Sequence, residues 1–224
     1  MGWFGSAERY ADRRDAGRRL APDLMVYKDR APVVLGLARG GLAVGVEIAR
    51  ALGCPLEPVF VRKIGVPHHE ELAAGAVVDG PTPEIVTNPD VCRMARVPES
   101  YIAAEAARQL AEIARRRGAY LGDRPPAAVA GRTAIVVDDG IATGASMRAA
   151  LIAVRRAGPA ALVMAVPVGA DDTLREMEAE VDALVCPLRP RDFGAIGAFY
   201  RDFHQVGDDE VVALLREANG SAGA

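Results

Sequence analysis

The sequence predicts an α/β fold: a mostly parallel, twisted sheet with helices on both faces and a small C-terminal cap (hood). Three observations carry this prediction. Short apolar runs of strand length alternate along the chain with longer segments that show the apolar spacing of helices. The strand-length runs are apolar throughout, which is typical of parallel strands covered on both faces. The 224 residues are enough for one such domain with a substantial core.

The elements of the first half follow in order. Residues 8–24 have apolar side chains at helical spacing between charged ones, and residues 33–38 form an apolar strand. The next helix ends near Gly53, a residue typical of helix ends, and residues 56–63 form a second strand. Residues 65–90 contain Gly, Pro and paired His, and they predict a long loop with short extended pieces.

The second half continues the alternation and then changes character. The expected elements are helices over 99–117, 145–157 and 208–217 and strands over 133–137, 160–168 and 182–187. From Arg189 onward, four aromatic residues fall within eleven positions. We therefore expect a single domain over residues 1–224. Its core occupies about 25–188, and its cap is formed by 189–224 with a contribution from 1–24.

Charge and composition exclude several classes of function. A formal net charge of −3 and an aromatic content of 5% favour neither a nucleic-acid surface nor a base-stacking module, so we expect no nucleic-acid partner. No apolar run approaches the roughly 20 residues that span a bilayer, so we expect no membrane partner. Three scattered cysteines suit a reducing compartment, and we expect a cytoplasmic protein.

Two adjacent carboxylates end the apolar strand in TAIVVDDGIATGAS, residues 133–146. Ligands of parallel sheets bind at the carboxyl ends of strands, where Asp138 and Asp139 lie. The next helix begins near Gly144, and its free N–H groups favour a phosphate there. Two acids beside a phosphate need hydroxyl donors or a divalent cation. A phosphorylated sugar suits the whole loop, because its phosphate meets the N–H groups and its hydroxyls meet the acids. A helix cap or a solvated acid pair is the alternative interpretation.

This stretch resembles a known signature. Residues 134–146 are similar to the phosphoribosyl pyrophosphate (PRPP) motif of type I phosphoribosyltransferases, in the strand, loop and helix context that the motif requires. The resemblance implies that Asp138 and Asp139 bind the ribose hydroxyls and contact Mg²⁺, mostly through those hydroxyls or water. It also implies a 5-phosphate loop made of Ala142, Thr143, Gly144, Ala145 and Ser146.

Two further stretches extend the resemblance. LGLARGGLAVG is similar to the family's pyrophosphate loop, which implies that Arg39, Gly40 and Gly41 meet the pyrophosphate. The family often has a non-proline cis peptide here, which implies one at Ala38–Arg39 or Arg39–Gly40. FVRKIGVPHHEELAAGAV is similar to the strand and mobile loop that cover the site, which implies that Lys63 lies near the leaving pyrophosphate. Lys63 is therefore a candidate catalytic residue together with the acid pair.

The C-terminal segment carries a weaker likeness. AFYRDFHQV is similar to a Tyr-Phe-Arg-Asp-Leu stretch of purine salvage transferases whose arginine contacts pyrophosphate, which implies a catalytic role for Arg201. Asp192, Phe193 and Tyr200 are candidates for the acceptor pocket, and the alternative for the aromatic residues is the core of the cap. Near the amino terminus, DRRDAGRRL resembles an uncharacterised bacterial group within the phosphoribosyltransferases.

The resemblance implies a Mg²⁺-dependent enzyme that transfers the 5-phosphoribosyl group of PRPP to a nitrogenous acceptor and releases pyrophosphate, with a homodimer as the family-level expectation. Two departures leave the acceptor open. The 6-oxopurine salvage enzymes carry an acid where this chain has Ala142, and they use a lysine after the PRPP motif, whereas no lysine follows Lys63 here. A PRPP-sensing regulator without turnover, or a hydrolase or phosphorylase acting on a phosphorylated ribose, are the alternatives.

Overall fold

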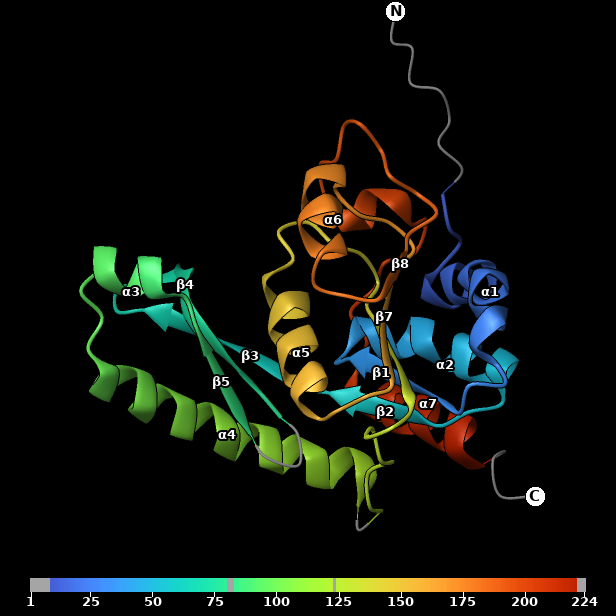
Figure 1. The fold of residues 1–224 in the computed structure, drawn as a ribbon, viewed down its shortest axis with the longest axis horizontal. Coiled ribbons are helices and arrows are strands. Elements are labelled where there is room, and N and C mark those ends of the chain that lie inside the picture. Colours follow the sequence, from blue (N-terminus) through green and yellow to red (C-terminus); the bar gives the residue numbers. More distant parts are fainter. Residues whose placement is uncertain (1–8, 80–82, 123, 221–224) are drawn as a thin grey trace, which may run out of the picture.

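Five parallel strands form the main sheet, in the order β2-β1-β6-β7-β8 (Figure 1). The computed structural model describes residues 9–79, 83–122 and 124–220, apart from the side chains of Glu70 and Glu71. The strands are β1 (Pro32–Leu37), β2 (Leu56–Val59), β6 (Thr133–Val137), β7 (Ala161–Ala165) and β8 (Ala183–Val185). The predicted parallel α/β sheet is confirmed.

Helices cover both faces of this sheet. The helices of the described residues are α1 (Arg13–Leu24), α2 (Gly40–Leu52), α3 (Pro89–Met94), α4 (Glu99–Leu121), α5 (Ala145–Arg156), α6 (Asp171–Glu178) and α7 (Asp208–Gly220), with 3₁₀ turns η1 (Met25–Tyr27) and η2 (Ile196–Phe199). Of these, α3 and α4 pack against strands outside this sheet (Figure 1). Along β1, Val34 joins a core with α2 and α7, whereas Leu35 joins a core with α5 and α6. This alternation is the period of two of a strand. No described helix has both the length and the apolar character that crossing a membrane requires.

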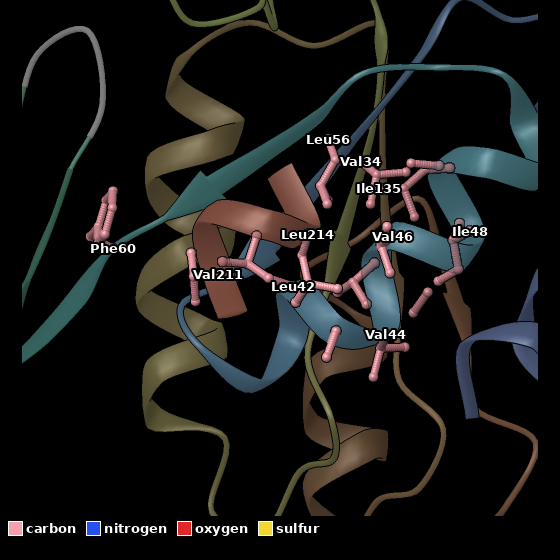
Figure 2. Packing of buried hydrophobic residues seen from close by; sticks show 14 of the residues in the cluster. Val34, Leu42, Val44, Val46, Ile48, Leu56, Phe60, Ile135, Val211 and Leu214 are labelled. Carbon is pink, nitrogen blue, oxygen red and sulfur yellow. The ribbon is translucent and has the colours of Figure 1, made fainter. Parts of the chain in front are cut away.

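Helix α2 lies in the middle of the first core and is buried along most of its length. Figure 2 shows its Leu42 and Val46 packed with Ile135 of β6 and Leu214 of α7. Gly53 ends the helix in the left-handed conformation, with φ of 65°, as the sequence predicts. The dense packing fixes the amino-terminal end of α2, which is where the predicted pyrophosphate loop lies.

A second, antiparallel sheet stands beside the first (Figure 1), and the prediction of a long loop over residues 65–90 is wrong. Its strands are β3 (Val61–Val66), β4 (His69–Val78) and β5 (Glu84–Thr87), in that order. The single strand predicted over 56–63 divides at Phe60, because β2 joins the main sheet and β3 the second. Alanine and glycine in the middle of β4 hide it from a propensity argument, but pairing with β3 and burial of Ala74 and Val77 hold it as a strand.

The aromatic residues of the C-terminal segment form a third, smaller core. Its buried members are Tyr10, Ala16, Val168, Phe199 and Tyr200, and Phe193 and Phe203 pack against them. The segment before α1 takes part through a backbone bridge between Tyr10 and Tyr200. Helix α7 packs instead with α2 and α4 in the first core, so only the part of the predicted cap before α7 belongs to this cluster.

Candidate active site at the carboxyl ends of β1 and β6

The loops after β1 and β6 lie against each other at the carboxyl edge of the main sheet, because the two strands are neighbours. A Cβ atom built on Gly41 would lie 2.4 Å from the Val137 carbonyl oxygen, and one built on Gly40 would lie 2.1 Å from Asp139 Oδ2. Only glycine permits this approach at either position. The structure thus brings the predicted pyrophosphate loop onto the acid pair, and its cis peptide is Ala38–Arg39, one of the two expected bonds.

The two acids have different surroundings. Asp139 is 9% exposed, and its Oδ2 accepts a hydrogen bond from Nε of Arg13 at 2.7 Å. Asp138 is partly exposed, and its Oδ1 accepts the backbone N–H of Asp139 at 2.9 Å. Burial, followed by the charge of Asp139, raises the pKa of Asp138 well above its usual range. Burial also raises the pKa of Asp139, against the opposing effect of Arg13.

The acid pair has the chemistry that a magnesium ion needs. Mg²⁺ prefers oxygen ligands, keeps several waters, and is usually held by one or two carboxylates together with phosphates of the substrate. Asp138 is partly exposed as a residue and its carboxylate accepts a backbone N–H, whereas Oδ2 of Asp139 is already bonded to Arg13. A cation would also favour the charged form of Asp138, which burial and then the charge of Asp139 disfavour. These residues therefore fit a cation held partly through water or substrate hydroxyls.

Arg13 is a part of the site that sequence reasoning missed, and Tyr10 packs in the third core behind the site. Arg13 precedes the buried Ala16 and Leu20 by three and seven residues, so it lies on the apolar stripe of α1. A charged residue on a buried stripe is a readable signal, because such a charge is rarely buried without a partner. The hydroxyl of Tyr10 donates to the Pro167 carbonyl at 2.9 Å, and its ring lies 5.5 Å from that of Tyr200.

The loop after the acids has the exposure and backbone of an anion site. Gly144 has a φ of 73° and precedes α5 without a side-chain cap, so it leaves first-turn N–H groups for another acceptor. The side chains of Ala142, Thr143, Ala145 and Ser146 are exposed. Thr173 Oγ1 of α6 donates to the Ala142 carbonyl at 2.7 Å, and this bond stabilises the conformation of the loop.

The basic residues predicted for pyrophosphate are distributed over three elements. Arg39 lies directly before α2 and is 24% exposed, and its guanidinium is 3.4 Å from Asp208, the first residue of α7. Lys63 is exposed on β3, in the second sheet. Arg201 is exposed in the cap, where its backbone N–H donates to the Tyr10 carbonyl at 2.9 Å. Arg13 is the basic side chain that contacts the acid pair directly.

The predicted acceptor-pocket residues also differ in environment. Asp192 is exposed, and Phe193 is partly buried with its ring 5.5 Å from that of Phe199. Tyr200 is 3% exposed, and its hydroxyl donates to the backbone carbonyl of Asp139 at 2.5 Å. Tyr200 therefore supports the acid pair from within the third core, and its hydroxyl is already committed to that contact.

Replacing Gly144 by alanine is expected to destabilise the protein through two separate effects. A left-handed alanine costs about 1–2 kcal/mol, and its Cβ would lie 2.1 Å from Met177 Cε and 2.9 Å from Thr173 Cγ2. Gly158→Ala is a matched control, because Gly158 has a φ of 71° and nothing within 4 Å of the added Cβ. Urea unfolding should show the larger loss for Gly144→Ala, and equal losses would contradict the contact between this loop and α6.

Comparison with known proteins agrees with this geometry. The family model described as the phosphoribosyl transferase domain matches residues 7–203. A Mycobacterium tuberculosis protein, recorded in two strains and named provisionally as a phosphoribosyl transferase, is 43% identical to this chain over 210 residues. The match covers 94% of this chain and 47% of that protein, so the chain spans about half the length of the curated relatives it matches.

A solved structure extends the likeness to the fold. The crystal structure of the protein TT1426 from Thermus thermophilus has 45% sequence identity to this chain and a TM-score of 0.81. That similarity covers 93% of this chain and 98% of the Thermus chain. Since the family model matches most of the chain, this chain belongs to the phosphoribosyl transferase domain family.

Proposed function

We propose that this protein is a Mg²⁺-dependent phosphoribosyltransferase that moves the 5-phosphoribosyl group from PRPP to a nitrogenous, nucleobase-like acceptor and releases pyrophosphate. The single observation that carries the proposal is the meeting of three parts at one sheet edge. These are the Asp138–Asp139 pair, the Gly40–Gly41 loop packed on it, and the start of α5 after Gly144. Such an edge is where parallel sheets bind ligands, and the family match supports the same reaction.

In the proposed reaction the bond from C1 of ribose to a pyrophosphate oxygen breaks, and its electron pair leaves with the pyrophosphate. A bond from C1 to an acceptor nitrogen forms, and the proton of that nitrogen passes to the pyrophosphate or to water. The N–H groups of residues 143–146 hold the 5-phosphate, and Asp138 and Asp139 hold the ribose hydroxyls. Negative charge near the ring favours the positive charge that develops on it. Bound Mg²⁺ would offset the charge of the leaving pyrophosphate. Arg39 and the adjacent glycine N–H groups receive that pyrophosphate, with Lys63 and Arg201 as further positive groups.

The acceptor in this proposal is a nitrogen base other than a 6-oxopurine recognised in the usual manner, because Ala142 stands where those enzymes carry an acid. Asp192 and Phe193 are the candidates for contacting it from the cap. We also propose a homodimer and a cytoplasmic location. The location is supported by the three cysteines, Cys54, Cys92 and Cys186, all of which are free thiols.

Incubation with PRPP, Mg²⁺ and a panel of nitrogen bases is expected to release pyrophosphate only when a suitable base is present. Removal of Mg²⁺ with a chelator should abolish release, because the leaving group then keeps its full charge. Pyrophosphate release that needs no base would instead indicate a hydrolase. Tight PRPP binding by calorimetry without turnover would indicate a sensor, and absence of both binding and release would overturn the proposal.

A further inference from the structure

The guanidinium of Arg13 touches several parts of the site at once. Its Nε donates to Asp139 Oδ2 at 2.7 Å, and its Nη1 donates to the backbone carbonyl of His204 at 2.7 Å. Its plane lies over the ring of Phe203, with Cζ 3.8 Å from the ring centre. A Cβ atom on Gly40 would lie 3.3 Å from Nε. One side chain therefore bonds the acid pair and the cap, and it lies beside the pyrophosphate loop.

The fold holds Arg13 firmly in this position. Asp12 caps α1 by accepting the backbone N–H of Asp15 at 2.7 Å, which starts the helix directly before Arg13. Gly17, one turn later, lies so close to α2 that a Cβ atom there would be 2.4 Å from the Val44 carbonyl oxygen. Because α1 is packed so closely on α2, the arginine and the amino-terminal end of α2 keep a fixed relative position.

The charges explain why a positive group is needed at this point. Two unpaired carboxylates directly below the pyrophosphate loop would repel an anionic substrate. Arg13 is 8% exposed and is paired with the buried Asp139, so it offsets one of the two negative charges. Asp138 as a residue is partly exposed, and among the described residues the hydrogen bond given for its carboxylate is the one from the Asp139 backbone N–H. The two acids are thus unequal before any substrate binds.

We propose that Arg13 is a positioning residue of this site: it fixes the Asp139 carboxylate and ties the cap to the acid pair beside the pyrophosphate loop, so that Asp138 is the acid that Arg13 leaves free to meet the substrate. This inference rests on the proposed function. The fork of Nε and Nη1 bonds two oxygen atoms that belong to different segments. A lysine carries one compact charged group and cannot reproduce that geometry.

The test compares Arg13→Gln and Arg13→Lys with Arg14→Gln. Arg14 is the next residue of α1, and it pairs with Glu47 and Glu217 away from the acids, so its variant controls for damage to the helix. We expect Arg13→Gln to raise the KM for PRPP about 10- to 100-fold, as losses of supporting contacts do. Arg13→Lys should recover part of that loss, and Arg14→Gln should stay within about twofold of the wild type.

A second measurement needs no turnover. Hydrogen–deuterium exchange of the unliganded proteins should show faster exchange at residues 139–141 and 200–204 in either Arg13 variant than in Arg14→Gln. If Arg13→Gln does not fold, Arg13→Lys gives the same comparison. Unchanged exchange, or an unchanged KM in a folded Arg13 variant, would overturn the inference. Wild-type protein that neither binds PRPP nor releases pyrophosphate would overturn the proposed function, while altered exchange would still support the structural part of the inference.

Discussion

Asp139→Asn is expected to destabilise the fold by about 1–3 kcal/mol, because the buried guanidinium of Arg13 keeps its charge and loses the one that faces it, whereas the cost of burying a charged Asp139 limits the loss. The Nε of Arg13 lies 2.7 Å from Asp139 Oδ2, and the side chains of the two residues are 10% and 12% exposed. An asparagine amide keeps the shape but not the charge. Urea unfolding followed by circular dichroism measures the loss.

Two further variants separate this explanation from a general effect of losing a carboxylate. Asp90→Asn breaks the exposed pair between Asp90 and Arg93, and it should change stability by no more than about 1 kcal/mol. Combining Asp139→Asn with Arg13→Gln removes both buried charges, so the double variant should be more stable than the sum of the single losses predicts, by about 0.5–3 kcal/mol. Strict additivity would mean that the two side chains do not depend on each other.

The local parts of the site are readable from the sequence, and the reason is physical. A buried parallel strand is a short apolar run, so the first and last residues of β6 can be predicted from the sequence. The acids follow β6 directly in the chain. The glycines of the pyrophosphate loop are equally local. Arg13, by contrast, meets Asp139 across 126 positions of sequence, and only the packing of α1 on α2 brings the two together. The sequence feature that could have identified Arg13 is its position on the apolar stripe of α1.

The same distinction, between local sequence signals and contacts of distant residues, explains the errors in the predicted fold. Helix α4 continues four residues beyond the predicted end at 117, although Gly118 interrupts the pattern. Tyr120 anchors that last turn, because its ring stacks on Phe60 at 5.6 Å and its hydroxyl donates to Asp208 at 2.6 Å. Strand β4 likewise depends on its partner β3 for its conformation. In both cases tertiary contacts outweigh a weak local preference.

Asp138→Asn is expected to lower turnover by about 10²- to 10³-fold, the usual result of removing one electrostatic group aimed at a transition state. Its effect on stability should be small or favourable, in contrast to that of Asp139→Asn. The asparagine oxygen can still accept the backbone N–H of Asp139, which now contacts Oδ1 at 2.9 Å. Burial and the charge of Asp139 raise the pKa of Asp138, so a neutral side chain relieves repulsion in the folded protein.

The pair of variants therefore gives a pattern that neither result gives alone. Pyrophosphate release at saturating PRPP measures turnover, and urea unfolding of the same preparations measures stability. Asp138→Asn should be folded and nearly inactive, because it removes the acid of the pair that Arg13 does not bind and that is free to hold the sugar. Asp139→Asn should lose more stability than Asp138→Asn, because the Asp139 carboxylate is bonded to Arg13. If Asp138→Asn kept wild-type turnover, the accessible acid would have no part in the reaction, and the division of roles between the two carboxylates would have to be given up.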